Sequence, residues 1–233
     1  MATDIEEGLD STGGWLRPAV FGAMDGLVSN FSLAMGVAGG SDPGSTKPII
    51  LAGLAGLAAG AFSMAAGEYT SVASQAEYSK ALVEFERQQI LADDKGEQEQ
   101  LAGFFEDKGI DADESRKAAA QVHDNIEDAV RVHSLEEYGV DIDNLPSPLL
   151  AASSSFFSFA VGALLPILPY LLGASVAWPA IVVSLLALFG CGAIVTHVTN
   201  RPWWYGGIRQ LILGAAAAGL TYLVGTVVGG QSL

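Results

Sequence analysis

The chain has 233 residues; half of them are hydrophobic, 16% are charged, and the formal net charge at pH 7 is −15. A mean hydropathy of +0.37 is typical of a membrane protein. The acidic balance and the lack of a basic stripe exclude a nucleic-acid-binding function, because such proteins need clustered Lys and Arg to neutralise phosphates.

The first 17 residues contain four acidic residues and a single basic one, Arg17. A secretory signal peptide begins with a positively charged region, so we do not expect a cleaved signal here. We expect residues 1–16 to form an N-terminal tail that precedes the first apolar segment.

Five apolar segments follow, and each is long enough to cross a bilayer. They lack the alternating pattern of barrel strands, so their backbone groups must be satisfied within helices. The sequence therefore predicts an all-α membrane protein with five transmembrane helices. The expected spans are Pro18–Ala38, Pro48–Ala73, Leu149–Gly173, Ala174–Val198 and Gly206–Gly229. The expected division is a tail (1–16), spans one and two (17–73), an insert (74–147) and spans three to five (148–233).

The first span carries a carboxylate, Asp25. A charge inside a bilayer costs at least roughly 2.5–3.5 kcal/mol, so such a residue usually faces a protein interior or a water-filled path. Counted from the span ends, Asp25 and Glu68 of the second span lie at similar depth, about 10–12 Å from the same side. Met64 shares a helix face with Glu68, one turn away. Two carboxylates and a thioether suit a transition-metal ion better than Mg²⁺ or Ca²⁺, although a lone Met is usually core filler.

Basic residues predict the orientation of the spans. The long segment 74–147 holds seven of the eleven Lys and Arg residues, and three more, Arg17, Arg201 and Arg209, fall on its side of the membrane. Only Lys47 falls on the opposite side. The positive-inside rule therefore places the insert and the N-terminus in the cytoplasm.

The insert has 19 acidic and seven basic residues, so it supplies most of the negative charge and should attract cations. Apolar residues at helical spacing predict three or four helices, the first continuing from span two. Gly109 and Gly139 should end helices, and Asp111 or Asp113 should cap the start of one.

Carboxylates on facing helices can chelate Mn²⁺ or Fe²⁺, although a solvated acidic face is the plainer interpretation for any single Glu. His133 and Glu137 form an i, i+4 pair, so their side chains should project together. His123 and Glu127 repeat this spacing ten residues earlier, and the pattern allows both pairs to lie on one helix.

Four stretches carry a resemblance to a known family: FGAMDGLVSNFSLAMGVAGG, GAFSMAAGEYTSVASQAEY, LLPILPYLL and NRPWWYGGIRQLILGAAAAGLTYLVG. With them the chain resembles the vacuolar iron transporter family over nearly its whole length. The resemblance implies a homodimeric secondary transporter, not an enzyme, without a tightly bound cofactor. Its expected activity is export of Fe²⁺ and often Mn²⁺ from the cytosol, coupled to proton antiport.

The resemblance also implies site residues. Asp25 and Met64 match the transport path of the family, and Glu68 belongs to the same signature. In the insert, the implied metal ligands are Glu86, Glu97 and Glu137. Two family glutamates correspond to Gln89 and Gln100, and paired methionines are replaced by His133 and Ser134, with His133 a substitute ligand. Replacing carboxylates with neutral amides should weaken cation capture.

Two alternatives stay open from the sequence. One is a membrane-anchored di-iron carboxylate oxidase, although the Glu-x-x-His pairs of such sites are absent. The other is a metal sensor without flux, against which Asp25 argues. The expected partners are divalent transition-metal ions, protons, the lipid bilayer and a second copy of the chain. The location would be the plasma membrane in a prokaryote or the vacuolar membrane in a eukaryote.

Overall fold

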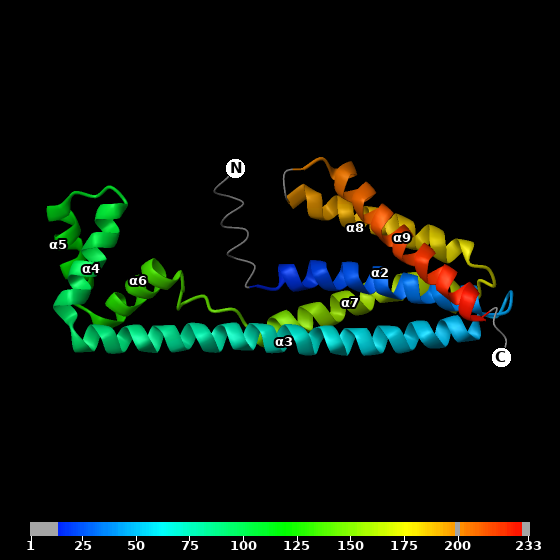
Figure 1. The fold of residues 1–233 in the computed structure, drawn as a ribbon, viewed down its shortest axis with the longest axis horizontal. Helices are drawn as coiled ribbons and strands as arrows, with labels where there is room; N and C mark the ends of the chain where they lie inside the picture. Colours follow the sequence, from blue (N-terminus) through cyan, green and yellow to red (C-terminus); the bar gives the residue numbers. More distant parts are fainter. Residues whose placement is uncertain (1–13, 199–200, 230–233) are drawn as a thin grey trace. The chain divides into compact units, whose positions relative to one another are not determined.

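The computed structural model describes residues 14–198 and 201–229, which form eight helices labelled α2 to α9 (Figure 1). Most of the expected N-terminal tail, residues 1–13, lies outside the described residues. The chain divides into two units at residues 70/71 and 147/148. We call Ser71–Ser147 the insert unit and the remainder the membrane unit.

The predicted fold class is confirmed: among the described residues, five helices are long and apolar enough to cross a membrane. Their bounds lie close to the expected ones, except that the fourth begins at Trp178 rather than Ala174. Gly173, at φ 96°, ends the preceding segment, and a short link follows before the next helix begins. The five helices are α2 (Leu16–Gly40), α3 (Lys47–Ala92), α7 (Pro148–Leu171), α8 (Trp178–Val198) and α9 (Trp203–Gly229).

Proline marks the start of four of these helices. Pro18, Pro48, Pro148 and Pro179 all lie within the first three residues of α2, α3, α7 and α8. The first turn of a helix has amide groups without an intrahelical acceptor, so a residue that lacks N–H costs little there. These positions explain why the starts of α2, α3 and α7 lie close to the expected ones.

Helix α2 is the centre of the membrane unit and contacts α7, α8 and α9 (Figure 1). Glycines permit the close approach. A Cβ added at Gly26 would overlap the carbonyl oxygen of Phe159 on α7, and one added at Gly162 would overlap the carbonyl oxygen of Ala23 on α2. Small residues at such contacts are the usual means of packing helices in lipid, where no hydrophobic effect drives association.

Asn30 joins three helices of the membrane unit. It is 2% exposed, and its amide nitrogen donates to the carbonyl oxygens of Gly53 on α3 and Ala163 on α7. Apart from this contact, α3 buries little of its surface. Only 17% of its most apolar 18-residue stretch is buried, and Leu51 and Phe62 are widely exposed. That face is suited to lipid or to another protein surface.

The insert unit contains the C-terminal part of α3 and three shorter helices. These are α4 (Asp94–Asp107), α5 (Ala112–Val122) and α6 (Ile126–Tyr138), as many as expected. Asp111 caps α5 by accepting from the amide of Asp113 at 3.0 Å, and Asn125 caps α6 in the same way. Gly109 and Gly139 have positive φ values of 89° and 66°, as expected for residues that end helices.

Two small apolar clusters hold the insert unit together. Ile90 of α3 packs with Ala129 and Val130 of α6, while Leu101 of α4 packs with Ala119 of α5. Arg87 of α3 also binds Glu127 of α6 through two hydrogen bonds of 2.6 and 2.7 Å. This packing fixes the rotation of α6 against α3, and with it the side chains that face each other.

Candidate metal sites

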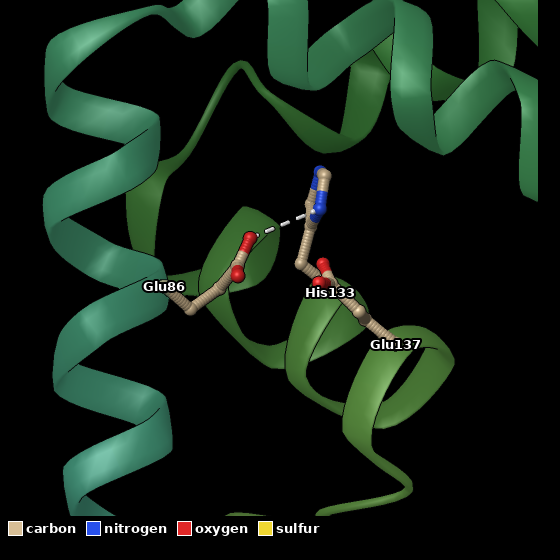
Figure 2. Close-up of side chains that lie close together, drawn as sticks. All are labelled: Glu86, His133 and Glu137. Atoms are coloured by element: carbon tan, nitrogen blue, oxygen red, sulfur yellow. Dashed lines mark ion pairs between the residues drawn. The ribbon is translucent and has the colours of Figure 1, made fainter.

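Three metal-capable side chains converge in the insert unit. Glu86 comes from α3, and His133 and Glu137 come from successive turns of α6 (Figure 2). Each offers a ligand atom, and these atoms lie within 4.8 Å of one another. The i, i+4 spacing puts the side chains of His133 and Glu137 together, as the sequence pattern indicated, and Glu86 faces them from α3.

Two of these side chains are fully buried, since Glu86 is 1% exposed and His133 is 0% exposed. Glu86 Oε1 lies 3.1 Å from His133 Nδ1, the pair joined by the dashed line in Figure 2, yet neither atom makes a hydrogen bond. Burying polar atoms without partners is costly. Two ligands held at right angles about 2.1 Å from one cation would lie roughly 3.0 Å apart, so the spacing fits a metal-binding pair.

Further polar groups surround this pair. Glu97 of α4 places Oε2 3.8 Å from His133 Nδ1, and its side chain is 13% exposed. Gln100 donates to Glu137 Oε2 at 3.2 Å, and Tyr138 donates to Glu86 Oε2 at 3.0 Å. The structure thus brings Glu86, Glu97, Glu137 and His133 together, with Gln100 at the rim. Gln89 is exposed, whereas Ser134 is buried.

Burial sets the protonation of the site. It lowers the pKa of His133 to about 4, with a smaller contribution from the neighbouring His123, so the imidazole is neutral at pH 7 and able to bind a metal. Burial and the nearby Glu137 raise the pKa of Glu97 above its usual value. A bound cation would relieve this crowding of carboxylates.

The possibility that His123 lies on one helix with Glu127, His133 and Glu137 is wrong, because only the last three lie on α6. Helix α5 ends at Val122, and α6 begins only after the cap Asn125, so His123 lies in the link. Glu127 faces Arg87 instead. The Asp-Asn pair before an apolar run is a signal for a helix start, and it could have revealed the break.

His123 and Asp94 were not expected near the metal site. His123 Nε2 lies 3.0 Å from His133 Nε2, and His123 Nδ1 lies 2.8 Å from Asp94 Oδ1. Sequence spacing gave no signal for this contact, because Asp94 begins α4 and lies 29 residues from His123.

The membrane unit has a second candidate site. Asp25, Ser29 and Asn30 of α2 line a cavity of about 260 Å³ together with Ser63 and Met64 of α3. The structure therefore brings Asp25 and Met64 together, whereas Glu68 lies one helical turn beyond Met64 and is not among the lining residues. A carboxylate, hydroxyls, an amide and a thioether in one cavity can replace part of the water shell of a transition-metal ion.

Comparison with known proteins shows which family the chain resembles, independently of the geometry of these two sites. Residues 16–226 match the family model described as VIT family. The chain is 34% identical over 222 residues to "Vacuolar iron transporter" from Acanthamoeba castellanii, which covers 92% of this chain and 78% of that protein. It is also 34% identical over 213 residues to "Vacuolar iron transporter homolog 1" from Oryza sativa subsp. japonica, covering 89% and 71%. For "Vacuolar iron transporter homolog 1" from Arabidopsis thaliana the identity is 33%, covering 91% and 84%.

Proposed function

We propose a specific transport activity for this chain, starting from the fact that it belongs to the VIT family and is a multi-pass membrane protein. Its general function is the transport of metal ions. More specifically, the protein exports Fe²⁺, Mn²⁺ or both from the cytosol, and proton movement in the opposite direction drives the export. It acts as a secondary transporter and not as an enzyme.

The observation that carries the proposal is the cavity shared by Asp25 and Met64. An ionisable residue in a membrane span is energetically costly, so a residue of this kind that is kept there usually has a function. Here the carboxylate opens into a space of about 260 Å³ that also contains a thioether and hydroxyl groups. This combination supports passage of a partly dehydrated transition-metal ion.

A carboxylate can hold either a proton or a cation at one time, which couples the two movements. An arriving dication displaces the proton from Asp25, and release of the dication on the far side lets a proton return. Glu68, one turn from Met64, would take part in the same exchange. In each step the dication only changes from one oxygen or sulfur ligand to the next.

The acidic insert gathers the ion before it enters this path. Glu86, Glu97, Glu137 and His133 would hold it, and the excess of 19 acidic over seven basic residues raises the local cation concentration. We place the insert and the N-terminus in the cytoplasm because the basic residues gather on that side. Trp203, Trp204 and Tyr205 are exposed, and aromatic residues of this kind usually lie at a membrane interface, which supports the same orientation.

We further propose a homodimer as the transporting form. The exposed apolar face of α3, which includes Leu51 and Phe62, can face a second copy as well as lipid. The location is the plasma membrane in a prokaryote or the vacuolar membrane in a eukaryote.

The test is ion flux in liposomes that contain the purified protein and carry a pH gradient. The wild-type protein should move Fe²⁺ or Mn²⁺ in proportion to the gradient, and Asp25→Asn should reduce flux to that of empty liposomes. Asp42→Asn is the matched control, because Asp42 lies in the loop between α2 and α3 and does not line the cavity. Equal flux in wild type and Asp25→Asn would disprove the proposed path. Metal binding without any flux would instead favour a sensor.

A further inference from the structure

A chain of polar side chains in contact leads from the metal site of the insert unit to the surface of the unit. Asp94 Oδ1 lies 2.8 Å from His123 Nδ1, His123 Nε2 lies 3.0 Å from His133 Nε2, and His133 Nδ1 lies 3.1 Å from Glu86 Oε1. Both imidazole side chains are 0% exposed, whereas the Asp94 side chain is 56% exposed. The metal site is thus linked, atom by atom, to a carboxylate at the surface of the unit.

The proton positions along this chain follow from what each group can donate. An ionised carboxylate only accepts hydrogen bonds, so His123 Nδ1 must carry the proton it shares with Asp94. In a neutral His123 the other nitrogen, Nε2, is then an acceptor. His133 Nε2 must therefore donate to it, which leaves a lone pair on His133 Nδ1.

The lone pair on His133 Nδ1 faces a lone pair on Glu86 Oε1. His133 Nδ1 and Glu86 Oε1 are both buried, both without a hydrogen-bond partner, and only 3.1 Å apart. Two acceptor atoms so close repel each other unless a cation or a proton lies between them. The hydrogen bond between His133 Nε2 and His123 thus leaves His133 Nδ1, which lies toward Glu86, free to bind a cation.

We propose that His123 and Asp94 are positioning residues that hold His133 in the tautomer whose Nδ1 is free to bind a metal ion. This inference rests on the metal site of the proposed function, and it adds how that site selects its ion. His123 and Asp94 do not touch the ion themselves. They act through the orientation and the tautomer of His133, as carboxylate–histidine pairs do at other metal sites.

The class of ion follows from the ligand that is positioned. A neutral imidazole nitrogen is a good ligand for borderline divalent transition metals, whereas Mg²⁺ and Ca²⁺ prefer oxygen. Fixing this nitrogen toward the carboxylates should therefore favour Fe²⁺ and Co²⁺ over Mg²⁺ and Ca²⁺. Mn²⁺ stands at the weak end of the transition-metal series, so it should lose least when His133 is misplaced.

The first experiment needs no metal. Nitrogen NMR of the full-length protein in detergent, labelled at histidine, distinguishes a protonated ring nitrogen from an unprotonated one. We expect His133 to have a protonated Nε2 and an unprotonated Nδ1, and His123→Leu to give a mixture of tautomers. A proton on Nδ1 of His133 in the wild-type protein would overturn the proposal.

The second experiment measures Co²⁺ binding to the full-length protein by its visible absorption, with Mg²⁺ as competitor. His123→Leu should weaken Co²⁺ binding about 10- to 100-fold, the usual effect of losing such a supporting group. His123→Gln should restore most of the affinity, because its amide oxygen can accept from His133 Nε2. Asp94→Asn should cause a smaller loss, and it covers the case in which the Leu variant fails to fold.

Asp113→Asn is the control, because Asp113 is exposed, pairs with Arg116 and lies outside the histidine chain. Wild-type affinity in both His123→Leu and Asp94→Asn would overturn the positioning role. Failure of the transport proposal would look different, since the tautomer and the Co²⁺ spectrum would be as expected while liposome flux is absent.

Discussion

At the scale of single residues, the insert site depends on a histidine that folding keeps neutral. Burial lowers the pKa of His133 to about 4, from an ordinary value of 6.5. Between these two values the unfolded chain binds a proton at His133 that the folded protein does not bind. The free energy of unfolding contributed by this residue therefore falls as the pH drops from about 6.5 to about 4.

This gives a prediction for pH dependence in metal-free protein. From pH 7 to pH 5, His133 should cost the folded state about 1–2 kcal/mol, at 1.36 kcal/mol per pH unit. Glu97, whose pKa is raised, acts in the opposite direction because it gains a proton more readily in the folded state. The difference between wild type and His133→Gln isolates the histidine. The free energy of unfolding of the wild type minus that of His133→Gln should fall steadily as the pH drops, as measured by thermal unfolding. A difference independent of pH would contradict the prediction.

Adjacent glutamates on α6 allow a matched test of the ligand set. Glu137 faces Glu86 and accepts from Gln100, whereas Glu136 forms an ion pair with Lys108. Glu137→Gln should weaken Co²⁺ or Mn²⁺ binding by at least about tenfold, because it removes a charged oxygen ligand. Glu136→Gln should leave the affinity nearly unchanged. Calorimetric titration of both variants decides the matter, and equal losses would mean that only total charge counts.

At the scale of elements, the close contact between α2 and α7 depends on glycines, which have no side chain to hold the two helices apart. A methyl group at Gly26 would meet the backbone of Phe159 and Ala163, and backbone atoms cannot move aside as a flexible side chain can. The two helices would have to separate, which would also disturb the hydrogen bond from Asn30 to Ala163. The cavity beside Asp25 is lined in part by Asn30 and Phe159, so the same contact shapes this cavity.

Gly26→Ala should therefore destabilise the protein by about 1–3 kcal/mol, the usual cost of overpacking. Gly67→Ala is the control: it is also a helical glycine, but nothing lies within 4 Å of an added Cβ. That variant should be neutral or slightly stabilising, since Ala is the better helix former. Thermal unfolding in one detergent compares the two. If both lowered the midpoint equally, close packing at Gly26 would not be the cause.

At the scale of the whole molecule, the proposed topology has a direct test. The insert and the loop between α2 and α3 should lie on opposite sides of the membrane, because one span separates them in sequence and the basic residues favour the insert side. Single cysteines at Glu106, in the insert, and at Asp42, in the loop, would report this in a chain whose Cys191 is replaced by Ala. Both positions are exposed.

A membrane-impermeant thiol reagent should label Glu106→Cys only when the cytoplasmic face of the vesicles is outside. Asp42→Cys should show the opposite pattern in the same vesicles. The Cys191→Ala parent provides the background signal. Labelling of both positions from one side would reject the topology, and the reversed pattern would mean that the insert faces away from the cytosol.

Local patterns sufficed to predict the five spans and the number of helices in the insert. Apolar runs of sufficient length allow little besides helices in lipid, and the prolines, Asp111 and Gly139 act on the turn in which they lie. For the same reason the i, i+4 relation of His133 and Glu137 was available from spacing. The comparisons confirm the resemblance to the vacuolar iron transporter family. The path and ligand residues that this resemblance implies stay predictions.

Only the tertiary structure decided which distant side chains meet. Glu86 reaches His133 because Ile90 and Val130 pack α3 against α6, and nothing near Glu86 in the sequence specifies that rotation. The break at Asn125 turned His123 away from Glu127 and toward His133, so its partner is set by the packing of α5 and not by spacing. Helices form from local interactions, but the facing of one helix toward another depends on the fit of side chains far apart in the chain.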